Sequence, residues 1–214
     1  ALTEGLAANT IDSIYGIING TSNYILSRMT RESQSFEAVL KDAQRAGYAE
    51  ADPTFDVAGV DSAHKLAILV SLAYGTPVNF KDIYTEGITH ITPTDIAYAK
   101  EFGCTIKLLG IAKLTNGEVE ARVHPTMVPS DSPIAKVDGV YNAIHLVGDA
   151  VGDVILHGRG AGSMPVSSNS PMSSRPKRCG SPFTQSQPVC CAGLSGKRSE
   201  NAIGEPLNGP PCMT

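Results

Sequence analysis

Residues 47–65 read GYAEADPTFDVAGVDSAHK. The first part of this stretch is polar and turn-forming, and the second part begins an apolar helix. Four carboxylates and one lysine fall within sixteen residues: Glu50, Asp52, Asp56, Asp61 and Lys65. Pro53 fixes the backbone inside the acidic half. From residue 60 the pattern predicts a helix that stops at Gly75, and on it Asp61 and Lys65 share one face. The apolar residues 66–70 that follow are expected to be buried.

The pair formed by Asp61 and Lys65 has two interpretations. An i,i+4 ion pair is usually a surface contact worth a few tenths of a kcal/mol, and acidic residues before a helix often act only as caps. A lysine that enters a buried helix while still paired is instead partly desolvated, and such a lysine can carry a proton in catalysis. The carboxylates are too dense for one helix cap. Spacing alone nevertheless favours the ordinary acidic loop and leaves the second interpretation open.

Helices and strands are predicted on both sides of this segment. Apolar spacing and caps predict helices over residues 21–29, 35–46, 60–74 and 94–102, and the end of another over 1–9. Strands are predicted over residues 11–18, 105–114, 118–127, 140–147 and 153–157. We expect a turn at Asn19-Gly20, a helix cap at Thr21 and a hairpin turn at Asn116-Gly117. This order predicts an α+β fold, a mixed β-sheet with helices packed on one face.

Composition limits the classes of function. The chain has 214 residues, enough for one large domain or two small ones, and its net charge of −4 argues against nucleic acid as a partner. No apolar run approaches the length of a membrane span, and the first residues lack the features of a signal peptide. The first residue is not Met, so we expect the chain to begin inside a longer protein. The five histidines show no metal-ligand spacing, so no metal site is predicted.

Residues 166–214 differ from the rest of the chain. They hold seven prolines, nine serines, four of the five cysteines, and five basic residues against two acidic ones. Cys190 and Cys191 are adjacent and no C-x₂-C pair occurs, so we expect disorder rather than a zinc or disulfide scaffold. The single remaining thiol, Cys104, fits a reducing cytoplasm. An out-of-frame or misassembled sequence also explains the abrupt change, a hypothesis that sequencing the source DNA tests.

Five further motifs flank residues 47–65 in a fixed order. They are GIINGTSNYIL (16–26), IYTEGI (83–88), DIAYAKEFG (95–103), IKLLGIAK (106–113) and GRGAG (158–162), the last followed by Met164-Pro165. Over residues 1–165 this series resembles the homoserine dehydrogenases of the bacterial monofunctional type. The resemblance implies a catalytic, substrate-binding and dimerisation domain. The family's nucleotide-binding Rossmann domain is expected to be absent, since no G-x-G-x-x-G follows a predicted strand.

The resemblance also implies an activity and its residues. The activity is the interconversion of L-homoserine and L-aspartate 4-semialdehyde with NADP or NAD, in cytoplasmic threonine, methionine and isoleucine biosynthesis. Lys65 is the implied catalytic residue. The implied substrate-binding residues are Glu50, Asp56, Asp61, Thr21, Gly20 and Tyr48, and the implied cofactor-binding residues are Gly158, Gly160 and Gly162. A homodimer through the sheet is implied, with neither nucleic acid nor membrane as a partner.

Structural alternatives remain for these assignments. Thr21 can be only a helix cap, Gly20 only a turn former and Tyr48 only a core aromatic. Asp52 is expected to shape the Asp-Pro turn, and His64 to face away from the lysine. Because the nucleotide-binding domain precedes this region in the family, we expect the chain alone to be inactive. The alternatives to the enzyme are a non-catalytic dimerising remnant of the fold and a dehydrogenase for another amino-acid semialdehyde.

Overall fold

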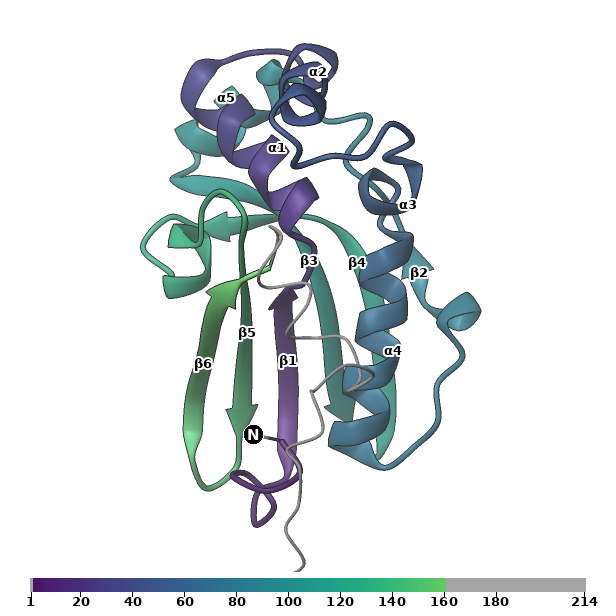
Figure 1. The fold of residues 1–214 in the computed structure, drawn as a ribbon. Helices are drawn as coiled ribbons and strands as arrows, with labels where there is room; N and C mark the ends of the chain where they lie inside the picture. The colour runs from purple at the N-terminus through teal and green to yellow at the C-terminus, as the bar shows by residue number, and fades with distance from the viewer. Residues whose placement is uncertain (1, 161–214) are drawn as a thin grey trace, which may run out of the picture. The chain divides into compact units, whose positions relative to one another are not determined.

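The computed structural model describes residues 2–160 of the chain (Figure 1). Its elements are β1 (Ile11–Ile17), α1 (Gly20–Glu32), α2 (Phe36–Arg45), α3 (Thr54–Val57), α4 (Val60–Tyr74), η1 (Phe80–Asp82), β2 (Tyr84–Thr85), α5 (Pro93–Glu101), β3 (Cys104–Thr115), β4 (Glu118–Pro129), η2 (Pro133–Lys136), β5 (Tyr141–Gly148) and β6 (Gly152–Arg159). The predicted α+β class is confirmed. Gly162 and segment 166–214 lie outside the described residues, so the predictions for them stay predictions.

The six strands form one mixed sheet in the order β2-β4-β3-β1-β5-β6. The short edge strand β2 runs parallel to β4, and every other neighbouring pair is antiparallel. The β3–β4 hairpin turns at Asn116 and Gly117, whose φ angles are 53° and 83°. Two consecutive left-handed residues are what a tight two-residue hairpin loop needs. The hairpin predicted from Asn-Gly is therefore confirmed.

The main core lies between the helices and one face of the sheet (Figure 1). Ile14 of β1, Ile25 of α1 and Leu66 of α4 are fully buried there. Burying a side chain of this size stabilises the fold by about 1.5–3 kcal/mol. In Figure 1, α4 lies along this face and α1 crosses its upper end, so both helices start near the point where β1 ends. This arrangement brings the residues of the acidic segment to the end of the central strand.

The opposite face of the sheet carries a smaller apolar cluster, which η2 covers in part. Its buried members are Ile17, Leu109, Ile111, Val128, Ile134, Ala135, Val137 and Ala143. Beside η2 a groove of about 440 Å³ remains, lined among others by Tyr15, Met127 and His145. Within the described residues this face is therefore apolar and only partly covered.

A buried lysine ties α1 to the segment that follows η2. Lys107 of β3 is 1% exposed, and its Nζ donates to the backbone oxygen of Val137 at 2.6 Å, to Asp138 Oδ1 at 2.9 Å and to Asn23 Oδ1 at 3.3 Å. Asn23 Nδ2 in turn donates to the backbone oxygens of Val137 and Tyr141, both at 3.0 Å. The ammonium thus has three acceptors, as a buried charge requires. The cluster fixes α1 against β3 and β5.

Several local predictions were wrong. Residues 2–9 form turns rather than a helix end. Gly20 is the first residue of α1 rather than part of a turn, and Asn19 caps the helix in place of Thr21 because its Oδ1 accepts from the backbone N–H of Ser22 at 2.8 Å. The short elements α3 and β2 were not predicted. A single helical turn and a two-residue strand are too short to show a period.

The apolar run 66–70 is buried only on one side. Leu66 and Val70 are fully buried, whereas Ile68 is 60% exposed. Helical geometry turns Ile68 away from the sheet on which Leu66 packs, and it does the same for Leu72, which is 53% exposed. The expectation that the whole run is buried was therefore wrong.

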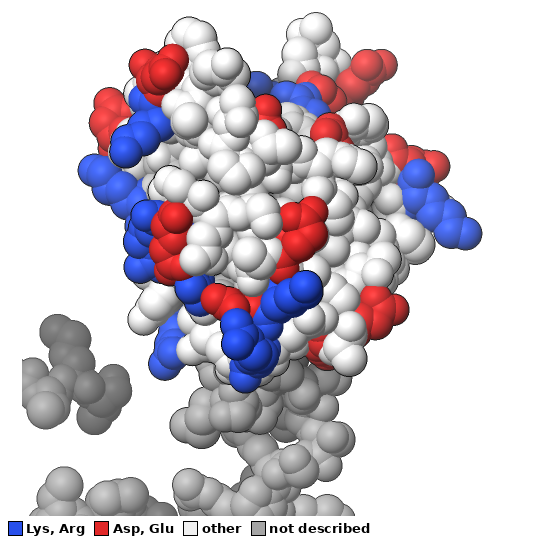
Figure 2. All heavy atoms as spheres, turned by 90° about the horizontal axis from the view of Figure 1, so that it is seen from above, with Lys and Arg blue, Asp and Glu red and all other residues white. Residues whose placement is uncertain are grey.

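Charges of both signs are interspersed on the part of the surface that Figure 2 shows, around a largely uncharged centre. That view shows no continuous basic stripe of the kind that tracks a phosphate backbone. None of the helices in residues 2–160 is both long and apolar enough to cross a membrane.

Candidate functional site

The turn between β1 and α1 gathers the polar groups of the site. Asn19 lies in this turn, is 5% exposed, and caps α1 through its Oδ1. Because that atom accepts a backbone N–H, the other end of the amide is the NH₂ group, and it points to the acidic segment. The turn therefore offers two N–H donors to side chains that arrive from elsewhere in the chain.

These donors bind two of the four carboxylates. Asn19 Nδ2 donates to Asp56 Oδ1 at 2.7 Å and to Asp61 Oδ2 at 2.9 Å. The hydroxyl of Ser22 also donates to the backbone oxygen of Asp56, at 3.0 Å. Asp56 belongs to α3 and Asp61 to the first turn of α4, so both helices are tied to the end of β1. The structure thus brings Asp56 and Asp61 together.

Lys65 lies one turn after Asp61 on α4. Its Nζ donates to Asp61 Oδ2 at 2.7 Å and to the backbone oxygen of Ile18 at 3.1 Å. The same carboxylate oxygen therefore receives both Lys65 and Asn19. The side chain of Lys65 is 48% exposed and that of Asp61 20%, so the described residues desolvate the lysine only in part. Within residues 2–160 two of the three ammonium donors are used, and one remains for a ligand.

The other predicted substrate-side residues lie around the start of α1. Thr21 Oγ1 donates to the backbone oxygen of Tyr48 at 2.9 Å, and the ring of Tyr48 packs on Tyr24 with centroids 4.7 Å apart. Gly20 is buried in the first turn of the helix. Glu50 is exposed, and its backbone oxygen accepts from Gln44 Nε2 at 3.1 Å. Within the described residues its carboxylate is not hydrogen-bonded to Asn19, in contrast to Asp56 and Asp61.

Asp52 shapes the turn before α3, as the sequence predicted. Its Oδ1 accepts from Thr54 Oγ1 at 2.6 Å and from the Thr54 backbone N–H at 3.1 Å. These two bonds hold the pKa of Asp52 below its usual value, because they stabilise the ionised carboxylate. Asp52 therefore has a local structural role that accounts for its position.

The segment IYTEGI at 83–88 packs against the backbone at the end of the acidic segment. The backbone N–H of Ile88 donates to the backbone oxygen of Val57 at 2.8 Å. Gly87 packs so closely that a Cβ added there would lie 2.2 Å from that oxygen and 2.6 Å from Ala58 Cα. This contact fixes the junction of α3 and α4, and with it the distance between Asp56 and Asp61.

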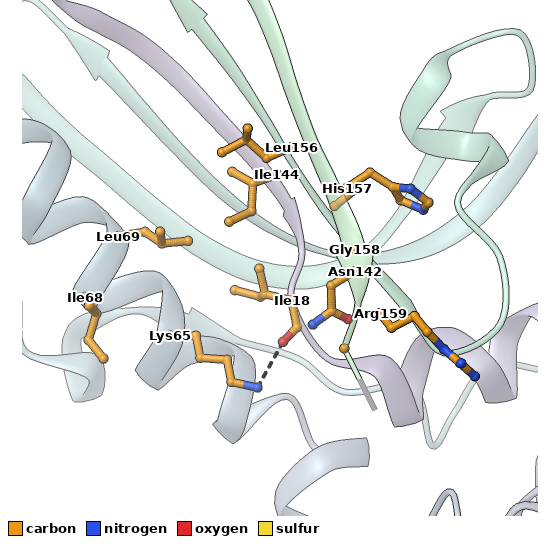
Figure 3. A pocket seen from close by; sticks show the side chains of 12 residues that line it. Ile18, Lys65, Ile68, Leu69, Asn142, Ile144, Leu156, His157, Gly158 and Arg159 are labelled. Carbon is orange, nitrogen blue, oxygen red and sulfur yellow. Dashed lines mark hydrogen bonds between the residues drawn. The ribbon is translucent and has the colours of Figure 1, made fainter. Parts of the chain in front are cut away.

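Lys65 opens on a cavity of about 640 Å³ between α4 and strands β5 and β6 (Figure 3). Ile68 and Leu69 line it from the helix, and Ile144 and Leu156 from the strands. The predicted cofactor-binding residues Gly158 and Gly160 also line it, together with Arg159. Lys65 and the segment of Gly158 and Gly160, about ninety residues apart in the sequence, therefore face the same cavity. Gly158 lies near the end of β6 and Gly160 just after it, and this segment is called the glycine loop below.

The glycines of this loop have different surroundings. An added Cβ at Gly160 would lie 2.2 Å from the side chain of Asn142, whereas one at Gly158 would meet no atom within 4 Å. Gly160 therefore leaves the space that the Asn142 side chain occupies, and Gly158 leaves room in the cavity. A cavity of this size with apolar walls and a glycine edge has the character of a small-molecule or cofactor site.

Two further residues pack on aromatic rings. His64 stacks on Phe80 with ring centroids 3.8 Å apart and packs beside Phe55 at 5.6 Å, which turns it away from Lys65. Arg159 lies over the ring of Tyr141 at 6.0 Å from its centroid while it lines the cavity. Within residues 2–160, no three His, Cys, Asp or Glu side chains are placed to hold a metal ion together.

Sequence reasoning missed three groups that build the site: the Asn19 amide, the Ser22 hydroxyl and the backbone oxygen of Ile18. The Asn19-Gly20 pair was interpreted as a turn, because this dipeptide is a frequent turn signal. A signal for the cap was nevertheless present, since Asn followed by Gly-Thr-Ser before an apolar helix also matches an N-cap. The carbonyl of Ile18 left no signal in the sequence.

Together the fold and the site define an α+β domain in which a lysine, held by Asp61 and by the end of a central strand, opens on a cavity of small-molecule size. The chain belongs to the homoserine dehydrogenase family, whose model matches residues 1–169. The family's members are oxidoreductases. This confirms the resemblance found in the ordered motifs.

Individual homoserine dehydrogenases are similar to this chain in sequence and in structure. A homoserine dehydrogenase of Neisseria gonorrhoeae is 54% identical over 168 residues, which are 78% of this chain and 39% of the relative. The crystal structure of a homoserine dehydrogenase from Thiobacillus denitrificans is 55% identical with a TM-score of 0.77, and covers 78% of this chain and 39% of that one. The Staphylococcus aureus enzyme at pH 6.5 is 46% identical with a TM-score of 0.72. The chain thus spans about two fifths of the length of these relatives.

Proposed function

We propose that this chain supplies the substrate side of a homoserine dehydrogenase, which interconverts L-homoserine and L-aspartate 4-semialdehyde with NADP or NAD. The observation that carries the proposal is the arrangement of Lys65. Its ammonium is fixed by Asp61 and by the Ile18 carbonyl, and it faces a 640 Å³ cavity edged by the glycine loop. The reaction needs such a group, because one proton moves at the C4 oxygen whenever the alcohol and the aldehyde interconvert.

Substrate binding is assigned to the carboxylates and to the start of α1. L-Homoserine carries an ammonium group, which charge-assisted hydrogen bonds to carboxylates hold best. Asp56 and Asp61 share the Asn19 amide, Asp61 is bonded to Lys65, and Glu50 lies on the neighbouring loop with its side chain exposed. We assign Gly20, Thr21 and Tyr48, which meet at the start of α1, to the same binding role, since a glycine allows a ligand to approach the backbone closely.

Lys65 moves the proton at the C4 oxygen. In the direction of reduction the ammonium donates a proton to the carbonyl oxygen of the semialdehyde, and in the direction of oxidation the neutral amine accepts it from the hydroxyl. Asp61 orients the amine toward the cavity and stabilises its positive charge. The Ile18 oxygen limits the rotation of the same group, so the remaining donor points to one place.

The nicotinamide cofactor supplies the hydride chemistry when it is bound. The residues of this chain assigned to it are Gly158, Gly160 and Gly162, and the first two edge the cavity beside Lys65. Apolar walls and an edge without side chains fit a flat ring. A homoserine dehydrogenase from a hyperthermophilic archaeon, 28% identical with a TM-score of 0.62, is known in complex with NADPH. We leave the choice between NADP and NAD open for this chain.

Further parts of the proposal concern assembly and context. The apolar, half-covered face of the sheet supports a homodimer through the sheet, since such a face gains by being covered. We place the catalytic and dimerisation domain in residues 1–165 and treat 166–214, of which the family model matches only residues 166–169, as a separate tail. The biosynthetic role in threonine, methionine and isoleucine formation and the cytoplasmic location follow from the proposed reaction.

A chimera tests the proposal. Residues 1–165 replace the matched segment of the Neisseria gonorrhoeae relative, and homoserine-dependent reduction of NADP or NAD is measured. We expect turnover, and we expect Lys65→Ala to lower kcat by at least about 100-fold while homoserine still binds, because a positioned acid/base group contributes 10²–10⁴-fold. Lys100→Ala, which changes an exposed lysine of α5, is the matched control and should leave kcat unchanged.

Two results contradict the proposal. A folded chimera that binds neither homoserine nor cofactor favours the non-catalytic remnant. A Lys65→Ala chimera with normal kcat and lost homoserine binding contradicts the proton-transfer role of Lys65.

A further inference from the structure

Asn19 is a buried polar side chain that the proposed function does not use. It is 5% exposed, and it makes three hydrogen bonds of 2.7 to 2.9 Å with Asp56, Asp61 and the backbone of Ser22. Its only local task, capping α1, needs the oxygen alone. Serine and aspartate cap helices as well as asparagine does. Capping therefore does not explain why the side chain carries an NH₂ group that donates to two carboxylates.

Electrostatics explains what the NH₂ group does for the two carboxylates. Two carboxylates that meet in a partly buried place repel each other, so without a shared donor one turns away. An amide NH₂ donates one proton to each carboxylate and carries no net charge. It holds both in place without neutralising them, whereas a lysine or arginine here would cancel the negative charge. The charge is left for Lys65 and for a cationic group of the ligand.

We propose that Asn19 is a positioning residue: its amide holds the carboxylates of Asp56 and Asp61 side by side in front of Lys65, and so makes the site select a ligand that carries an ammonium group. This inference rests on the proposed function for the identity of the ligand. Asn19 acts through the two carboxylates, and because it also caps α1, the positions of the carboxylates depend on the start of that helix.

The test compares two ligands on the full chain by calorimetry. L-Homoserine carries the ammonium, and 4-hydroxybutyrate has the same carbon chain and hydroxyl without it. In Asn19→Ser the hydroxyl still caps α1 but spans no pair of carboxylates. We expect homoserine to bind about 10- to 100-fold more weakly, because charge-assisted bonds to a misplaced carboxylate are lost. Binding of 4-hydroxybutyrate should change by less than about twofold.

A control variant separates positioning from stability. Ser35→Ala removes the cap of α2, where Ser35 Oγ accepts from the backbone N–H of Ala38, away from the two carboxylates. It should lower thermal stability and leave the ratio of the two affinities unchanged. Equal weakening of both ligands in Asn19→Ser, or no weakening of either, overturns the positioning role.

A second measurement needs no ligand. In the wild-type chain both side-chain N–H protons of Asn19 are bound to carboxylates, so they should exchange with solvent far more slowly than those of exposed Asn116 in the β3–β4 turn. Asp56→Ala and Asp61→Ala should each release one of them. If the wild-type chain binds neither ligand, the substrate assignment fails and the exchange rates still decide the role of Asn19. Fast exchange in the wild type overturns it.

Discussion

Gly87→Ala should lower the activity of the site although Gly87 itself does not face a ligand. Gly87 does not have a positive φ, so its backbone can accept alanine. The new Cβ, however, would lie 2.2 Å from the backbone oxygen of Val57 and 2.6 Å and 2.9 Å from Ala58 Cα and C. All three atoms are backbone, so no side-chain rotation relieves the contact. The junction of α3 and α4 has to move.

The size of the movement follows from these distances. Ordinary contact begins near 3.4 Å, so the Val57 oxygen has to retreat by about 1 Å. The hydrogen bond from the Ile88 N–H to that oxygen, 2.8 Å long, is stretched by the same movement. Overpacking of this kind costs about 1–3 kcal/mol of stability. Asp56 immediately precedes Val57, and misplacing a binding group by 1 Å can lower a rate by about 100-fold.

Two assays measure these effects. Urea unfolding of the full chain gives the loss of stability, and homoserine-dependent turnover of the chimera gives the loss of activity. The control is Gly103→Ala, since Gly103 has a φ of 68° and open space around its added Cβ. Alanine there costs about 1–2 kcal/mol of backbone strain and should leave kcat unchanged. A Gly87→Ala protein with wild-type kcat and KM would refute the claim that this contact sets the site's geometry.

Two predictions concern buried polar groups. Burial lowers the pKa of Lys107 although Asp138 opposes this, so the folded state binds fewer protons and stability rises as the pH approaches the ordinary lysine value. Asp138→Asn should cost about 1–3 kcal/mol at neutral pH, and less in urea unfolding at high pH, where the lysine is neutral. Burial raises the pKa of Tyr74 to about 12, and its hydroxyl has no hydrogen-bond partner among the described residues. Tyr74→Phe should therefore be neutral or stabilising by about 1 kcal/mol in calorimetric unfolding, and it should abolish the loss of stability expected as the pH rises from 10 to about 12.

Long elements with a clear period could be predicted from the sequence. Helix 60–74 was predicted with the bounds of α4, because its apolar residues repeat at helical spacing and Gly75, with a φ of 67°, stops it. The β3–β4 hairpin followed from Asn116-Gly117. The juxtaposition of Asp61 and Lys65 followed from their i,i+4 spacing. In each case the signal is local, so a short stretch of sequence contains the whole cause.

Groups that act over long sequence distances could not be predicted in this way. Asn19 meets Asp56 and Asp61 across about forty residues, and nothing in the sequence near either partner marks the contact. The exposure of Ile68 depends on which side of α4 the sheet covers. The same limit applies to the cavity, whose lysine and glycine loop meet only after β1 has been placed between α4 and β5.

The atoms just past the end of β1 therefore stabilise the fold and also position the side chains of the site. The Ile18 carbonyl and the Asn19 amide lie just past the strand, and they hold Lys65, Asp56 and Asp61. Any change that loosens α1 or α4 from the strand also moves the Asp61–Lys65 pair. Stability and binding geometry are thus coupled at this point. The coupling explains why the acidic segment, ordinary by its spacing, acts as a fixed site: its order comes from the partner strand and not from the segment itself.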